Sequence, residues 1–132
     1  MISTRGRYAL RVMLDLAQNQ GDAYVPMKDV ALRQGLSLKY LEQILPLLKQ
    51  NDFVTGIQGK GGGYRLTRDK ADYTIGEILR ATEKDLAPVS CLAHGAKECE
   101  RRATCQTIEF WEGFNDVIND YLDSKTLADL IK

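Results

Sequence analysis

The apolar residues at the start of the chain recur at the three- and four-residue spacing of an amphipathic helix. They are Ala9, Val12, Met13, Leu16 and Ala17. This spacing predicts a helix over residues 4–19 with one buried face. Thr4 is a suitable cap for its start, because a threonine hydroxyl accepts a hydrogen bond from a free N–H of the first helical turn.

Two further helices are predicted in the first fifty residues. One spans residues 26–34, where a proline opens the segment and Gly35 follows its end, as is typical of helix termini. The other spans residues 38–50 behind Ser37, a capping residue. Pro46 removes one backbone hydrogen bond from this helix and predicts a bend there. The tight turn at Gly35 is typical of a helix-turn-helix unit.

The period then shortens to that of β-strands. Residues 53–58 and 64–67 predict two strands, and four glycines between them predict a hairpin. A short helix is expected over residues 74–82, followed by irregular chain over residues 83–105. The order of these elements predicts a fold that is mostly α with a small β-hairpin, a winged helix-turn-helix followed by a long C-terminal helix.

That last long helix has an apolar face wider than one small domain needs to cover. It is predicted from about residue 106 to residue 122, with a short helix after Ser124. We expect part of the face to pack against a second copy of the chain, because symmetric dimers are common. Packing against its own domain is the alternative. The residues expected at the homodimer interface are Ile108, Trp111, Phe114, Ile118 and Leu122.

Charge is unevenly distributed, although the net charge is zero. Residues 1–70 hold eleven Lys or Arg and six Asp or Glu, whereas residues 71–132 hold seven and twelve. A basic first part favours a polyanionic partner, with chance segregation of surface charge as the other interpretation. No apolar run approaches the ~20 residues that span a membrane. Three cysteines also argue against a secreted disulfide framework, so we expect a cytoplasmic protein with no membrane partner.

The helix at residues 38–50 is the expected recognition helix. A helix in the DNA major groove presents its N-terminal side chains to base edges. Gln43 suits adenine, Glu42 suits cytosine and Lys39 suits a phosphate, although an ordinary solvated face would look similar. The glycine-rich hairpin is the expected wing. The residues predicted to contact double-stranded DNA are Ser37, Lys39, Tyr40, Glu42, Gln43, Gln58, Lys60 and Arg65.

The same glycines do not form a nucleotide-binding motif. A dinucleotide fingerprint would place glycine where Tyr64 stands, and a P-loop would place serine or threonine where Gly61 follows Lys60. No catalytic base accompanies the cysteines and no C-x-x-C pair is present. We therefore do not predict an enzyme.

Cys91, Cys99 and Cys105 are separated by seven and five residues. This spacing matches no common zinc site, where cysteines are two to four residues apart. Three thiolates on one irregular loop suit iron, with a fourth ligand from elsewhere. Buried free cysteines and a thiol sensor are the alternatives. His94, the only histidine, is a candidate fourth ligand.

Several short sequences occur together in one order and spacing: Ser3 to Ala9, Tyr40 to Gln43, Gly61 to Tyr64 and Thr126 to Leu130. With the three cysteines, they make the chain resemble the IscR/NsrR/CymR group, the "Rrf-two" family of bacterial regulators, over essentially its whole length. The resemblance implies a winged-helix homodimer that binds operator DNA. It also implies that the three cysteines hold an iron–sulfur cluster of the 2Fe-2S type, as in the cluster-binding members.

The chain departs from this family at three places. Ile108 stands where the cluster-assembly regulators carry histidine, and Tyr8 or a neighbour stands where the nitric-oxide-sensing members use aspartate. His94, Glu98 and Glu109 remain as candidate fourth ligands. The wing has Gln58 and Lys60 around Gly59 where the family often has arginine and proline, which predicts an altered DNA preference.

Two functional hypotheses result. The first is a transcription regulator, a repressor, that senses iron–sulfur or redox status through the cysteine loop. The second is a cysteine-metabolism-type regulator that senses through thiol oxidation or a partner enzyme, without a cluster. In both, residues 1–82 form the winged helix-turn-helix DNA-binding domain, residues 83–105 the sensor loop, and residues 106–132 the dimerisation helix and C-terminal helix.

Overall fold

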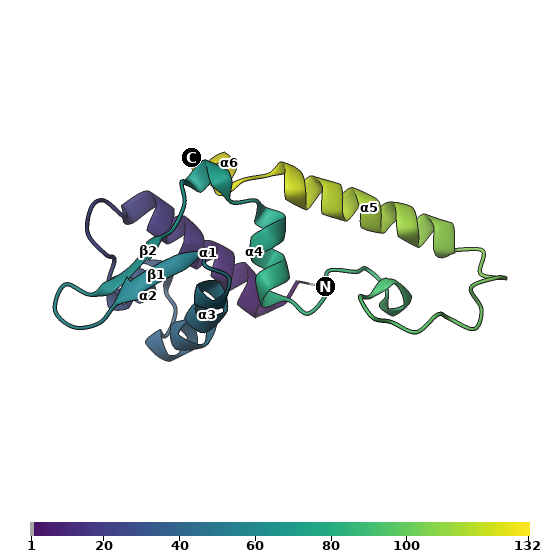
Figure 1. Ribbon diagram of the computed structural model, residues 1–132, viewed down its shortest axis with the longest axis horizontal. Coiled ribbons are helices and arrows are strands. Elements are labelled where there is room, and N and C mark those ends of the chain that lie inside the picture. Colours follow the sequence, from purple (N-terminus) through teal and green to yellow (C-terminus); the bar gives the residue numbers. More distant parts are fainter. Residues whose placement is uncertain (1) are drawn as a thin grey trace.

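The computed structural model describes residues 2–132. The N-terminal helices, the hairpin and the last short helix form one body, from which the long C-terminal helix and the irregular chain before it extend as an arm (Figure 1). Among the described residues, no helix has the length and apolar character needed to cross a membrane. The elements are α1 (Thr4–Asn19), α2 (Met27–Gln34), α3 (Leu38–Gln50), β1 (Val54–Ile57), β2 (Gly63–Leu66), the 3-10 helix η1 (Lys70–Asp72), α4 (Ile75–Thr82), the 3-10 helix η2 (Ser90–Leu92), α5 (Ile108–Ser124) and α6 (Leu127–Leu130).

The turn between α2 and α3 lies at the predicted residues. Gly35 closes α2 in the left-handed conformation, with φ of 65°, and Ser37 caps α3 by accepting a hydrogen bond from the Tyr40 N–H at 3.0 Å. The cap predicted for α1 is wrong. Ser3 has extended backbone and accepts the Gly6 N–H, whereas Thr4 is already the first helical residue and therefore cannot take the capping position.

The hydrophobic core lies where α1, α3 and α4 meet. Its centre includes the fully buried residues Met13, Leu16, Leu41, Ile44 and Ile78. Their spacing along each helix is the one that the sequence pattern predicts. Burying one large aliphatic side chain contributes about 1.5–3 kcal/mol, so these positions hold the helix-turn-helix against the rest of the body.

Tyr73 connects the hairpin to this core. Its side chain is fully buried, its hydroxyl donates to the Phe53 carbonyl at 2.7 Å, and it accepts from the Thr67 and Arg68 N–H groups, each at 3.0 Å. A buried hydroxyl needs such partners because an unsatisfied polar group costs stability. The base of the wing is therefore anchored by one side chain.

The hairpin pairs β1 with β2 in antiparallel register, with Val54 opposite Leu66. The Val25 and Tyr64 backbones also exchange two hydrogen bonds, of 2.8 and 2.9 Å. Gly63 has φ of 150°, and a Cβ there would collide with the Val25 carbonyl. A glycine is required at this position because two backbones approach so closely.

The helix α5 begins later and ends later than predicted, at Ile108 and Ser124. Only its C-terminal part is fixed to the body: the Arg80 guanidinium of α4 pairs with Asp123 at 2.6 Å and donates to Asn119 at 2.7 Å. After α5 the chain returns to the core, where Leu127 is fully buried. The preceding irregular chain therefore continues to residue 107.

Candidate nucleic-acid interface and cysteine segment

The first turns of α3 present three uncommitted polar side chains. Lys39, Glu42 and Gln43 are exposed, and within residues 2–132 their side chains form no hydrogen bond or ion pair. Tyr40 differs because it is half-buried, with its ring edge-on to that of Tyr8 at 5.4 Å between centres. The Ser37 hydroxyl is occupied by capping. Of the five contacts predicted for Ser37 and the first turns of α3, three are free to meet a base or a phosphate.

A buried ionic network holds α2 against α1. Asp15 is 1% exposed, pairs with Arg33 at 2.7 Å and accepts from the Gln34 amide at 3.0 Å. The hydrogen bonds that the Arg33 guanidinium donates to Asp15 are the main cause that raises the pKa of Arg33. Arg11 completes the network by donating to the Gln34 side-chain carbonyl at 3.1 Å and to the Gln34 backbone carbonyl. Because α2 leads directly into the turn before α3, the network helps to position α3.

Sequence reasoning did not identify this network. The available indication was an aspartate among the apolar residues of segment 4–19, one residue before Leu16. A charged residue is seldom fully buried unless it is paired, but the partner is 18 residues away. Sequence spacing alone does not reveal such a partner.

The wing carries its predicted side chains in two environments. Gln58 and Lys60 are exposed near the tip, where Gly59 and Gly61 take positive φ values of 93° and 76°. Arg65 is half-buried at the base, and its guanidinium lies 5.7 Å from the centre of the Tyr24 ring. The tip is thus free to approach a polyanion, while Arg65 also holds the loop before α2.

The three cysteines lie on the chain between α4 and α5. Cys99 is exposed, Cys91 and Cys105 are half-buried, and all three are free thiols. In the described part of the chain, no three His, Cys, Asp or Glu side chains lie together as a metal site would require. The Thr107 hydroxyl and N–H lower the pKa of the Cys105 thiol. This favours the thiolate, which is the form that binds metal.

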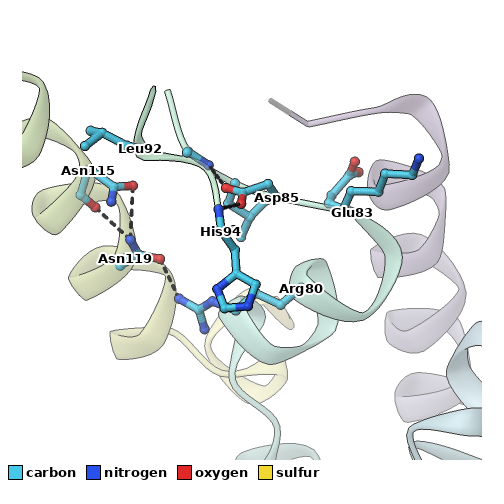
Figure 2. Close-up of a pocket in the computed structure, with 10 residues that line it drawn as sticks. Arg80, Glu83, Asp85, Leu92, His94, Asn115 and Asn119 are labelled. Atoms are coloured by element: carbon cyan, nitrogen blue, oxygen red, sulfur yellow. Dashed lines mark hydrogen bonds between the residues drawn. The ribbon is translucent and has the colours of Figure 1, made fainter. Parts of the chain in front are cut away.

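A polar cavity of about 390 Å³ separates the start of this segment from α5 (Figure 2). The Asp85 carboxylate accepts the N–H groups of Ala87, at 2.7 Å, and His94, and these bonds lower the pKa of Asp85. His94 lines the cavity together with Arg80 and Asn119. The structure therefore places His94 at this cavity and does not gather it with the cysteines.

One face of α5 is apolar and uncovered. The exposed fractions are 63% for Phe110, 42% for Phe114, 67% for Val117 and 61% for Tyr121. The rings of Phe110 and Phe114 stack with centres 6.3 Å apart. In the single chain, this face of α5 therefore does not pack fully against its own domain. The remaining predicted interface residues are half-buried, namely Ile108, Trp111, Ile118 and Leu122.

The family model for "Iron-dependent Transcriptional regulator" matches residues 2–132. The HTH-type transcriptional regulator IscR of Photobacterium profundum is 35% identical over 131 residues, which cover 99% of this chain and 75% of that protein.

Two solved structures are similar. CymR, the global cysteine regulator of B. subtilis, has a TM-score of 0.81 and 33% identity, with 98% of this chain and 95% of that chain covered. T. potens IscR has a TM-score of 0.77 and 35% identity, with 98% and 85% covered. The predicted fold, mostly helical with a winged helix-turn-helix, is confirmed. The chain belongs to the Rrf2 family of transcriptional regulators.

Proposed function

We propose that the chain is a cytoplasmic homodimeric repressor that reads operator DNA through α3 and the wing and responds to its cysteine segment. The observation that carries the proposal is the set of free side chains at the start of α3, a helix that directly follows α2, which the Asp15 network ties to α1. Binding and positioning are the roles of its residues, and we assign it no catalytic step. Residues 1–82, 83–105 and 106–132 are the DNA-binding, sensor and dimerisation parts.

The readout of sequence is divided among the side chains of α3. Glu42 and Gln43 are assigned to base edges, because a carboxylate accepts from cytosine and an amide pairs with adenine. Lys39 on α3 and Lys60 on the wing are assigned to phosphates, which position the protein without reading sequence. Tyr40 is half-buried, so we assign it to supporting this face of α3 and not to contacting a base.

The chemistry of the cysteine segment fits a 2Fe-2S cluster, since thiolates are its preferred ligands. Cys91, Cys99 and Cys105 would hold it, with a fourth ligand from His94, Glu98 or Glu109. When bound, the cluster supplies a redox-sensitive and removable group. Because the described conformation does not gather the three thiols, loading requires the segment to rearrange.

That rearrangement is how the segment would act on DNA. The segment joins α4 to the free start of α5, while the other end of α5 is tied to Arg80. Reordering it would change the angle at which α5 leaves the body. In a dimer built on α5, this angle sets the spacing of the two recognition helices, and a shift of a few kcal/mol is enough to select one spacing.

A second candidate is supported by the exposure of Cys99 and by the likeness to CymR. In this version the cysteines respond to oxidation or to a partner enzyme, and no cluster binds. The DNA-reading part is the same in both versions, so the two differ only in what the segment detects.

In vitro selection from a randomised duplex pool tests the DNA-reading part. We expect the wild-type dimer to select a pseudo-palindromic sequence with half-sites about one helical turn apart or a multiple of it. The variant Gln43→Ala should lose preference at one base position in each half-site, by about 1–3 kcal/mol. Lys39→Ala is the control, because loss of a phosphate contact weakens all sequences alike. Selection of no sequence by the wild-type protein would contradict the proposal.

A further inference from the structure

The motif at residues 3–9 contains cations that the proposed interface does not use. Arg5 and Arg7 lie in the first turns of α1, where no Asp or Glu is present in the first turn. Cations near a helix N-terminus do not stabilise the helix. The charge of these arginines therefore has no explanation within α1 itself.

Arg7 lies beside Tyr8, whose ring contacts α3. Its guanidinium carbon is 6.0 Å from the centre of the Tyr8 ring, and the Tyr8 ring meets the Tyr40 ring edge-on at 5.4 Å. Tyr40 belongs to the first turn of α3, next to the free Lys39. The row Arg7–Tyr8–Tyr40 thus continues the exposed face of α3 onto α1.

A second arginine on the same ring shows which of the two is free. The Arg11 guanidinium lies 5.2 Å from the centre of the Tyr8 ring and donates to Gln34 at the end of α2. It is therefore committed to holding α1 and α2 together. Arg7 is exposed, and its side chain forms no hydrogen bond or ion pair with any residue from 2 to 132. Among the described residues, the Arg7 guanidinium beside this aromatic pair is therefore left without a counter-charge.

The dimensions of DNA indicate what this cation meets. The major groove is about 12 Å wide and is bordered on both sides by phosphates. When the first turn of α3 enters the groove, a guanidinium one aromatic pair away lies over the groove edge rather than over the bases. Arginine is well suited to phosphate because its planar fork donates two hydrogen bonds at once.

We propose that Arg7, positioned by Tyr8 against Tyr40, binds a DNA backbone phosphate at the edge of the groove that α3 occupies. This inference rests on the proposed DNA-binding function. It adds α1 as a third contact element beside α3 and the wing. The contact strengthens binding to every sequence equally and fixes the depth of α3 in the groove, because phosphate contacts position and base contacts specify.

The test is the salt dependence of binding to a fluorescently labelled random-sequence duplex, measured by anisotropy over a series of KCl concentrations. For Arg7→Ala we expect weaker binding and a log–log slope that is shallower by about 0.9 for each arginine removed. Arg7→Lys should keep most of the slope because it keeps the charge. Lys132→Ala is the matched control, since it removes the same charge after α6, away from α3 in Figure 1.

Arg7→Gln, which keeps much of the side-chain length without the charge, replaces Arg7→Ala if the alanine variant does not fold. Thermal unfolding and sedimentation establish that each variant is folded and assembled as the wild type is. A neutral Arg7 variant that is folded and keeps the wild-type slope overturns this inference alone. A wild-type protein that binds no duplex overturns the proposed function and the inference together.

Discussion

The Asp15 carboxylate shows how much one residue contributes to the placement of the recognition helix. It is buried in α1, while its partner Arg33 has a side chain that is 38% exposed. Removing the arginine leaves a buried charge with a single hydrogen bond from Gln34. Removing the carboxylate leaves an arginine that water can still reach. The two substitutions are therefore not equivalent, and loss of Arg33 is the more costly.

We predict that Arg33→Ala lowers the free energy of unfolding by about 2 kcal/mol, the size of a hydrogen-bonded charge pair after allowance for the partly solvated arginine. Urea denaturation followed by circular dichroism measures this difference. Arg5→Ala is the matched control, because Arg5 is exposed on the same pair of helices and should change stability by less than about 0.5 kcal/mol. Equal stability of the two variants would show that the network does not hold α2.

At the scale of elements, α5 is built differently from α1 to α4. Those four helices each bury at least one side chain, whereas α5 buries none. Its aromatic residues contact one another along one face. Among residues 2–132, its ion pair to the body is the one between Arg80 and Asp123. Such a helix is stabilised poorly by its own domain. A second α5 packed against this face would supply the missing apolar contacts.

We predict that Phe114→Asp converts the dimer to a monomer without unfolding the winged-helix body, because Phe114 is 42% exposed in the single chain. Sedimentation velocity at micromolar concentration measures the assembly, and circular dichroism establishes that the helices remain. Asp116→Lys, a charge change on the polar face of α5, should leave the dimer intact. A wild-type protein that sediments as a monomer would contradict the assignment.

The whole molecule combines a packed winged-helix body with an irregular cysteine-containing segment. The body contains the ion-paired α1–α2 junction and the anchored wing, whereas residues 93–107 contain no helix or strand. The His94 N–H donates a hydrogen bond to the Asp85 carboxylate, which holds the start of this stretch. In the mechanism proposed above, a change at the cysteines would act on the arm and reach the proposed DNA-binding face through the geometry of the dimer.

Anaerobic reconstitution with iron and sulfide tests the sensor at this scale. We expect a visible absorption band in the wild-type protein, a weaker or absent band in Cys91→Ala, Cys99→Ala and Cys105→Ala, and a change in operator affinity on loading. Ser90→Ala is the control because it alters the neighbour of a proposed ligand. A colourless wild-type product would contradict the cluster and leave the regulator that senses thiol oxidation or a partner enzyme.

Sequence reasoning placed the helices, the hairpin and the turn at Gly35, because these depend on periodicity and on caps within a few residues. Ser37 and Gly35 act on their immediate neighbours, so their roles were predictable. The cap of α1 was missed because Ser3 and Thr4 are both suitable types, and only the backbone conformation distinguishes them.

Tertiary structure decided which polar side chains are free. Tyr40, Arg65 and Ser37 look as exposed in the sequence as Lys39 does, yet each has a partner in the folded chain. Arg7 and Arg11 are four residues apart on one helix, and only Arg11 meets Gln34. These differences depend on contacts between segments far apart in the chain. The local pattern alone determines elements, whereas the packing of those elements determines which charges remain for a partner.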